Sequence, residues 1–129
     1  MSNSKLSELL PANVRFYPEA EEDFLALDRG RQIKVIKALD KIAKAPRQLG
    51  KPLENQPGRL LAGFRSIYVD KKSIRIVWQA ASSGEVEVAV VAGIAERDGL
   101  FVYDLVAKRR QEVESLVARV VNSLPKASE

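Results

Sequence analysis

The chain has 129 residues and contains neither cysteine nor histidine, which narrows the possible chemistry before any motif is considered. A disulfide framework and a Ser-His-Asp triad are excluded, and zinc or copper sites are disfavoured. Apolar residues make up 46% and charged residues 29%, as is typical of one globular domain with a hydrophobic core. We expect no metal or cofactor, and any acid–base chemistry to use Tyr, Lys, Asp or Glu.

The net charge of +4 is distributed unevenly along the chain. Residues 29–75 hold thirteen Lys or Arg against three acids, whereas the remaining residues hold eight bases against fourteen acids. Such segregation is expected of a surface that binds a polyanion, and also of a solvated basic face. The first residues lack the pattern of a secretion signal, and no apolar run is long enough to span a bilayer. We therefore expect a cytoplasmic protein without a membrane span.

The N-terminal part is predicted to hold a helical turn, a short strand and two helices. Residues 4–10 form the turn and residues 14–17 the strand, each ended by a proline. Residues 19–28 are predicted to form the first helix, with acids in its first turn. A second helix over residues 31–45 has an apolar face, and its opposite face carries Lys34, Lys37, Lys41 and Lys44. This lysine stripe either keeps the helix solvated or faces RNA.

The central part is predicted to form a three-stranded antiparallel sheet, reached through a loop-rich segment over residues 46–63. Strands are expected over residues 64–69, 74–80 and 86–92, joined by short turns. The third strand is almost continuously apolar, which is typical of burial on both faces. In the second strand, alternation places Arg75, Val77 and Gln79 on the face opposite to Ile74, Ile76 and Trp78.

The last predicted helix begins at Gly99 and ends near Leu124, with Asp98 as N-cap and Pro125 as the stop. A helix of about 25 residues spans about 37 Å, which is more than we expect a three-stranded sheet to cover. Its distal half is therefore expected to be exposed or to be covered by another chain, for example in a dimer formed through this helix. The order of strands and helices predicts an α+β domain.

Four segments of the sequence are informative when they are taken together: VRFYPEAEEDF, QIKVIKALDKIAKAPRQLGKPL, GFRSIYV with SIRIVW, and GIAERDGLFVYDLVAKR. In this order and spacing they resemble the RelE/ParE superfamily of toxins from type II toxin–antitoxin systems. The resemblance implies one domain with a core over residues 14–110, an N-terminal extension over 1–13 and a C-terminal helix extension over 111–129. It implies a short N-terminal strand, a two-helix hairpin, a three-stranded antiparallel meander and a long C-terminal helix.

The resemblance implies one of two toxic activities. In the RelE branch, the family cleaves mRNA in the ribosomal A site without a metal, which inhibits translation and arrests growth. In the ParE branch, the similar fold inhibits DNA gyrase. In both branches a cognate antitoxin neutralises the toxin, so the implied partners are an antitoxin with mRNA and the ribosome, or an antitoxin with gyrase. A third interpretation is a non-catalytic protein of this fold whose long helix serves assembly.

The family motifs match three residues of this sequence. Arg75 matches the arginine of the sheet, Arg97 the arginine after the last strand, and Tyr103 the tyrosine of the final helix. Arginine does not deprotonate in proteins, so Arg75 and Arg97 are expected to stabilise the phosphate, while Tyr103 acts as a base or stacks on a nucleobase. Further RNA contacts are expected from the basic residues Arg65, Lys71, Lys72, Lys34, Lys37, Lys41 and Lys44.

The sequence departs from the RelE pattern in the strand before Arg75. The lysine pair of that strand is not reproduced, because Ser66 and Tyr68 stand near its place. The three site residues also have structural alternatives: Tyr103 could pack at the edge of the apolar stripe, Arg97 could pair with Glu96 or Asp98, and Arg75 could bridge to Glu87.

Overall fold

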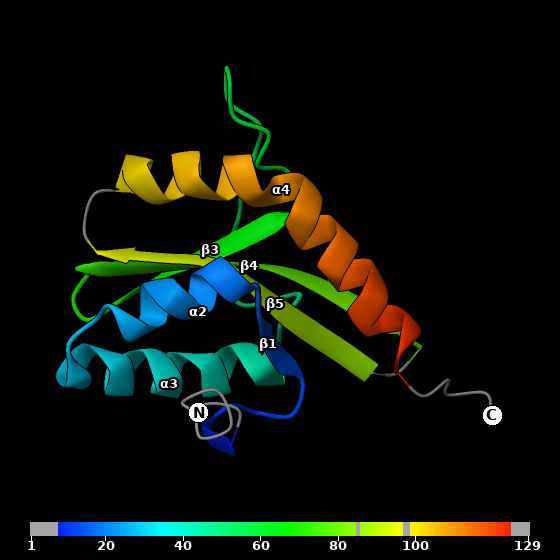
Figure 1. Cartoon of the computed structure of the whole chain (residues 1–129), viewed down its shortest axis with the longest axis horizontal. Helices are drawn as coiled ribbons and strands as arrows, with labels where there is room; N and C mark the ends of the chain where they lie inside the picture. The colour runs from blue at the N-terminus through cyan, green and yellow to red at the C-terminus, as the bar shows by residue number, and fades with distance from the viewer. Residues whose placement is uncertain (1–7, 85, 97–98, 125–129) are drawn as a thin grey trace.

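A five-stranded mixed sheet forms the middle layer of the computed structural model (Figure 1). The structure describes residues 8–84, 86–96 and 99–124. The strand order is β1-β5-β4-β3-β2, with β1 parallel to β5 and the other neighbours antiparallel. Helix α4 covers one face of this sheet, and α2 and α3 lie on the other side. The predicted α+β class is confirmed.

The elements follow one another in the predicted order, except that the segment predicted to be a loop over residues 46–63 also holds a short strand, β2. They are β1 (Val14–Phe16), α2 (Pro18–Leu25), α3 (Arg29–Lys44), β2 (Lys51–Pro52), β3 (Phe64–Val69), β4 (Ile74–Ser83), β5 (Val86–Glu96) and α4 (Gly99–Asn122). The predicted meander is β3-β4-β5, and the sheet is wider because β1 and β2 extend it at its two edges. Within the predicted turn at residues 4–10, only 8–10 are described, and 8 and 9 are helical.

The end of α2 and the start of α3 differ from the prediction because Asp28 caps α3. Its side chain accepts a hydrogen bond of 2.8 Å from the backbone N–H of Arg31, so α3 begins at Arg29 and not two residues later. Helix α2 ends earlier than predicted, at Leu25. The side chain of Gln32 donates to the carbonyls of Phe24 and Leu27, at 3.2 and 3.1 Å, and satisfies the end of α2.

The alternation predicted for β4 separates the two sides of the sheet. Trp78 is fully buried, and its indole N–H donates to the carbonyl of Pro46, just after α3. Val77 lies opposite Gly93, which faces α4. Arg75, two residues before Val77, points to the same side and contacts Tyr103 of α4. The charged side chain of β4 is therefore placed under α4.

The apolar stripe of distal α4 packs on this chain's own sheet, so the prediction that this half would be exposed or covered only by another chain is wrong. A dimer formed through this helix stays a prediction. Val113 is fully buried and Val120 is 9% exposed. Strand β5 has 11 residues, which extend over about 36 Å at about 3.3 Å per residue. The 24 residues of α4 also span about 36 Å. The strands are longer than predicted, and α4 bends along them (Figure 1).

Tyr17 ties the distal half of α4 to the start of α2. Its hydroxyl donates a hydrogen bond to the carboxylate of Glu112, and the ring is buried. This hydrogen bond, together with burial, raises the pKa of Tyr17 to about 12.

None of the helices in the described part of the chain is long and apolar enough to cross a membrane.

An ion pair between α2 and α4 covers the edge of β5 where β1 ends. Beyond Phe16, the backbone of β5 no longer has β1 as a neighbour. There the carboxylate of Asp23 accepts hydrogen bonds from the N–H of Ile94 at 3.2 Å and from Nη1 of Arg109 at 2.9 Å. Arg109 also donates to the carbonyl of Ala92 at 2.8 Å. The pair therefore satisfies backbone groups that the missing strand would otherwise pair.

Gly93 allows α4 to approach β5 closely. A Cβ atom at this position would lie 2.9 Å from Cγ2 of Val106 and 3.6 Å from Cγ2 of Val102. We predict that Gly93→Ala lowers the free energy of unfolding by about 1–3 kcal/mol, because the helix must shift to make room. Urea unfolding measures the change.

Gly30→Ala is the matched control for this prediction. Gly30 lies in α3, and the nearest atom to an added Cβ is 3.6 Å away. Alanine is the better helix former, so this variant is expected to gain up to about 1 kcal/mol of stability. Equal stability of Gly93→Ala and the wild type would show that the approach at Gly93 is not tight.

Candidate functional site

Arg75 is held against two tyrosine rings from two different elements. Its guanidinium carbon lies 4.1 Å from the ring centre of Tyr68 and 4.8 Å from that of Tyr103. Tyr68 is the cross-strand neighbour of Arg75 on β3, and Tyr103 comes from the start of α4. Both distances are within the range of cation–π attraction. The rings restrict the guanidinium to one place at this end of the sheet.

The guanidinium of Arg75 is desolvated and incompletely hydrogen-bonded. The residue is only 9% exposed, and its buried Nε has no hydrogen-bond partner among the described residues. The expected alternative, a bridge from Arg75 to Glu87, is wrong, because Glu87 lies opposite Ser82 and its carboxylate is 3.9 Å from Arg47. An unsatisfied buried N–H is costly, and the terminal nitrogens of a guanidinium can bind an oxyanion such as phosphate.

The structure brings two of the three predicted site residues together. Tyr103 is half-buried, and its ring packs both against the hydrophobic core and against Arg75. The structural alternative for Tyr103, packing at the edge of the apolar stripe, is therefore compatible with a place beside Arg75. Arg97 and Asp98 lie outside the described residues, so the predicted role of Arg97 and the predicted N-cap stay predictions.

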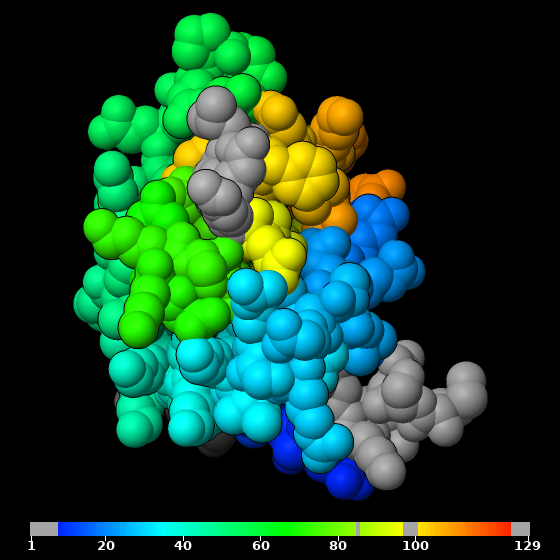
Figure 2. All heavy atoms as spheres, turned by 90° about the vertical axis from the view of Figure 1, so that its left-hand side faces the viewer, coloured from blue at the N-terminus to red at the C-terminus, as the bar shows by residue number. Residues whose placement is uncertain are grey.

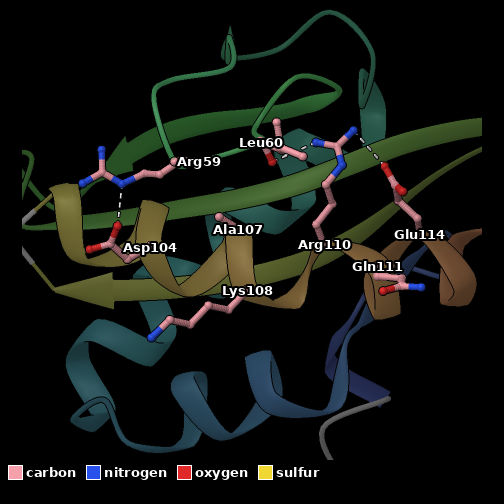
Figure 3. Close-up of a pocket in the computed structure, with 9 residues that line it drawn as sticks. Arg59, Leu60, Asp104, Ala107, Lys108, Arg110, Gln111 and Glu114 are labelled. Atoms are coloured by element: carbon pink, nitrogen blue, oxygen red, sulfur yellow. Dashed lines mark hydrogen bonds and ion pairs between the residues drawn. The ribbon is translucent and has the colours of Figure 1, made fainter.

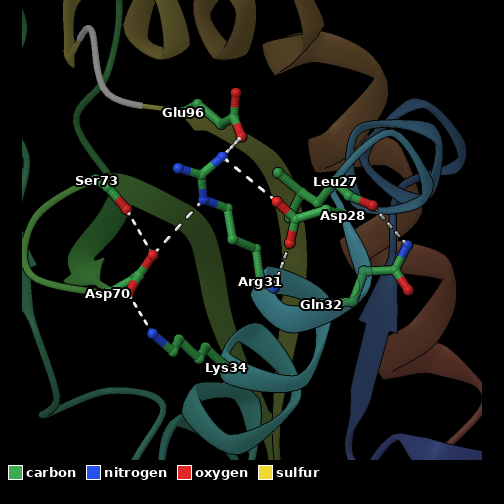
Figure 4. Close-up of polar contacts among 8 residues, drawn as sticks. All are labelled: Leu27, Asp28, Arg31, Gln32, Lys34, Asp70, Ser73 and Glu96. Carbon is green, nitrogen blue, oxygen red and sulfur yellow. Dashed lines mark hydrogen bonds and ion pairs between the residues drawn. The ribbon is translucent and has the colours of Figure 1, made fainter.

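The turn between β3 and β4 carries the two predicted RNA-binding lysines and is clamped to α3 (Figure 4). The carboxylate of Asp70 accepts hydrogen bonds from Lys34 and, at 2.9 Å, from the hydroxyl of Ser73. Nε of Arg31 lies 3.6 Å from the same carboxylate. These contacts, with the bond from Lys34 first among them, lower the pKa of Asp70.

The clamp holds an unusual backbone conformation. Asp70, Lys71 and Lys72 all have positive φ, at 56°, 56° and 71°. Residues other than glycine adopt this region at a cost in energy, so the ion pairs of Asp70 offset strain in the turn. Lys71 and Lys72 are exposed at its tip. Arg31 also pairs with Glu96, the last residue of β5, so α3 holds both segments next to the site.

Figure 2 shows this end of the molecule, where the turn between β3 and β4 (green), the start of α3 (cyan) and the start of α4 (yellow) meet. The lysine stripe of α3 is exposed, as predicted. Helix α3 lies on the other side of the sheet from α4, however, so the stripe and Arg75 do not share a face. Of the four lysines of the stripe, Lys34 alone contacts the turn within the described part of the chain, through Asp70. The predicted RNA contacts of Lys37, Lys41 and Lys44 stay predictions.

Arg65 does not join Arg75. It lies opposite Trp78 in the sheet, and its guanidinium donates to the carbonyls of Gln48, Leu49 and Gly50, at 3.1, 2.7 and 3.2 Å. These bonds fix the loop after α3. We therefore leave Arg65 out of the proposed site.

Tyr68 is the residue that sequence reasoning did not assign to the site. In the sequence it only stands near the place of the expected lysine pair. The available signal was the register of the hairpin, because a turn over residues 70–73 places Tyr68 opposite Arg75 and on the same face. The contact itself depends on side-chain orientation, which that pattern does not specify.

A groove lies between α4 and the loop before β3 (Figure 3). This groove has a volume of about 630 Å³, and four of the charged residues that line it are paired with one another. Arg59 pairs with Asp104, and Arg110 pairs with Glu114 at 2.9 Å and donates to the carbonyl of Leu60 at 2.9 Å. The lining includes neither Arg75 nor Tyr103, so the groove is separate from the candidate site.

Asp70→Asn tests the clamp on the turn. Because the pKa of Asp70 is lower in the folded chain than in the unfolded one, its ionised form stabilises the fold above the ordinary aspartate pKa. We predict that Asp70→Asn is less stable than the wild type at neutral pH. The difference should shrink as the pH falls through the lowered pKa, because the wild type then loses the same charge. Urea unfolding at several pH values measures it, and a difference of equal size at every pH would contradict this account.

Comparison with known proteins identifies the fold of the chain but no family model or curated protein that matches its sequence. Among solved structures, the isolated RelE toxin of E. coli aligns with a TM-score of 0.51 and 18% identity, over 75% of this chain and 96% of that chain. An E. coli RelE mutant in the free state, with two arginines changed to alanine, aligns with a TM-score of 0.59 and 21% identity, over 74% and 94%.

A toxin–antitoxin complex adds to this result. A chain of the RelBE2 complex of Mycobacterium tuberculosis aligns with a TM-score of 0.53 and 24% identity, over 68% of this chain and 100% of that chain. These likenesses show that the chain has the fold of RelE toxins.

Proposed function

We propose that this protein is the toxin of a type II toxin–antitoxin system and that it cleaves mRNA in the cytoplasm, with the ribosome positioning the RNA. The observation that carries the proposal is the buried guanidinium of Arg75, which packs against Tyr68 and Tyr103 and has an Nε without a partner among the described residues. Exposed Lys71 and Lys72 lie in the adjoining turn and would attract the RNA backbone. The RelE fold is consistent with this function.

The proposed reaction is attack of a ribose 2′-hydroxyl on the neighbouring phosphate. The new bond joins the 2′-oxygen to phosphorus, the bond to the 5′-oxygen breaks, and the products are a 2′,3′-cyclic phosphate and a 5′-hydroxyl. The 2′-proton must leave and the 5′-oxygen must gain one. Arg75 stabilises the charge that develops on the phosphate oxygens, through hydrogen bonds that strengthen in the transition state. Arg97 is proposed to act near the leaving oxygen.

Tyr103 has two possible roles in this reaction. As a phenolate, its oxygen could accept the 2′-proton and become the neutral hydroxyl, or its ring could stack on a nucleobase. A site without histidine is a weak proton-transfer catalyst, so much of the rate must come from holding the RNA in the reactive geometry. This requirement is the physical reason for proposing the ribosome as a partner.

Expression in cells with mapping of mRNA 5′ ends tests the proposal. We predict growth arrest and new, codon-phased 5′ ends for the wild type. Arg75→Gln should reduce cleavage by about 10²–10³-fold, as expected for removal of one charge-stabilising group. Arg119→Gln removes the same charge from an exposed position on distal α4 and should cleave as the wild type does. The absence of new ends, or equal cleavage by Arg75→Gln, would contradict the proposal.

Tyr103→Phe separates the two roles of Tyr103 in the same assay. The variant keeps the ring beside Arg75 and removes only the hydroxyl. Loss of cleavage would assign proton transfer to the hydroxyl, whereas retained cleavage would assign stacking to the ring. Equal cleavage by the double variant Arg97→Ala with Tyr103→Ala and by the wild type would remove both residues from the site.

A cognate antitoxin is part of the proposal. The fold is shared with RelE chains that were solved in complex with an antitoxin, including the RelBE complexes of E. coli and Mycobacterium tuberculosis. The exposed lysines and the partly exposed apolar surface of α3, which includes Ile33 at 49% exposure, suit an acidic amphipathic segment.

Inhibition of DNA gyrase is the second candidate function. It is favoured by the absence of the lysine pair, because Ser66 and Tyr68, which lie near its place on one face of β3, carry no positive charge. Growth arrest without new mRNA ends, together with lost supercoiling activity of purified gyrase, would support this function and not RNA cleavage. The third interpretation, a non-catalytic assembly protein, has lost its motivation, because this chain's own sheet covers much of distal α4.

A further inference from the structure

Tyr68 has an aromatic ring that core packing does not explain. The residue is 49% exposed and, unlike Tyr103, it is not among the side chains packed against the hydrophobic core. Among the aromatic residues that the structure describes, only Tyr68 and Phe101 are exposed to this extent. A large ring that remains half in water on a strand contributes little to the stability of the fold. Its contact with Arg75 therefore requires a separate account.

The surroundings of Tyr68 combine an aromatic surface with a phosphate-binding group. The guanidinium of Arg75 lies 4.1 Å from the ring centre, and exposed Lys71 and Lys72 follow within a few residues. Single-stranded RNA presents a phosphate and an unstacked base in each nucleotide. Proteins bind it by placing basic groups on the backbone and aromatic rings on the bases. The arrangement at Tyr68 has both elements next to each other.

We propose that Tyr68 stacks on a nucleobase of single-stranded RNA, beside the phosphate that Arg75 binds. This inference rests on the proposed function and makes its substrate more specific, because a ring can reach a base face only where the RNA is unpaired. Tyr68 stands near the position of the expected lysine pair, but it would contact the RNA in a different way. A lysine contacts the phosphate, whereas a tyrosine contacts the base.

The alternative role of Tyr68 is only to hold Arg75 in place. Two substitutions of Tyr68, combined with the removal of one base from the RNA, separate this role from stacking. Tyr68→Phe keeps the ring for both roles. Tyr68→Leu keeps apolar bulk next to Arg75 and removes the aromatic face. An RNA that lacks one base keeps its phosphates. If Tyr68 stacks on that base, its removal and Tyr68→Leu eliminate the same contact, and the two effects do not add.

The experiment measures binding of the full chain to a short fluorescent single-stranded RNA by anisotropy. The RNA carries 2′-O-methyl groups so that it cannot be cleaved, and a series of such RNAs lacks one base at successive positions. We expect Tyr68→Leu to weaken binding roughly tenfold, the size of one lost stacking contact, while Tyr68→Phe binds as the wild type does. One abasic RNA should bind the wild type equally weakly and should not be weakened further by Tyr68→Leu. Leu60→Ala, another exposed apolar residue, is the control and should bind normally.

Three results would overturn the inference, and they differ in what else they affect. If Arg75→Gln weakens binding and Tyr68→Leu does not, the stacking role is wrong and the RNA site remains. If Tyr68→Leu weakens binding to every abasic RNA equally, Tyr68 only positions Arg75. If the wild type binds none of the RNAs, direct recognition of RNA fails, and the inference fails with it. Urea unfolding of each variant shows whether a loss of binding comes from a loss of folding.

Discussion

The close approach of α4 to β5 at Gly93 is the constraint on which the rest of the structure depends. Val102 and Val106 pack where a side chain at Gly93 would stand, and Arg109 then reaches Asp23 and the backbone at the uncovered edge of β5. These contacts fix both the distance of α4 from β5 and the direction of the helix axis. The first turns of α4 consequently lie over Arg75, which pairs with Ala95, two residues beyond Gly93 on β5. Tyr103 meets Arg75 because of that packing.

The candidate site therefore lies where three elements meet, and each of them supplies one side chain. Strand β4 supplies Arg75, β3 supplies Tyr68, and α4 supplies Tyr103. Helix α3 contributes no side chain to this cluster, yet its Arg31 is tied to Asp70 and to Glu96, in the two segments next to the site. A preorganised, desolvated cation is better suited to stabilising a charged transition state than to transferring a proton. In the proposed reaction, catalysis therefore depends on Arg75 and on positioning of the RNA.

Period-two alternation and helical periodicity predicted the fold class, the meander and the side on which Arg75 lies. They underestimate the length of β4 and β5, because Ser and Gly favour turns. The predicted strands end at residues 80 and 92, whereas Ser82, Ser83 and Gly93 pair within the sheet. That error led to the wrong expectation for distal α4. The contact of Tyr68 with Arg75 and the bonds of Arg65 to loop carbonyls depend on long-range packing, on which local pattern carries no information. Charge density likewise predicted a basic face, although the lysine stripe of α3 lies on the side of the sheet away from Arg75.

The central claim is that the RNA supplies its own nucleophile while the protein stabilises the phosphate. The most direct test is cleavage of ribosome-bound mRNA by the purified protein, with analysis of the new ends and with a single 2′-deoxy substitution at the nucleotide before the cut. The account predicts a 2′,3′-cyclic phosphate and a 5′-hydroxyl, and no cleavage at the substituted position. Cleavage of the 2′-deoxy RNA, or products with a 5′-phosphate, would contradict it.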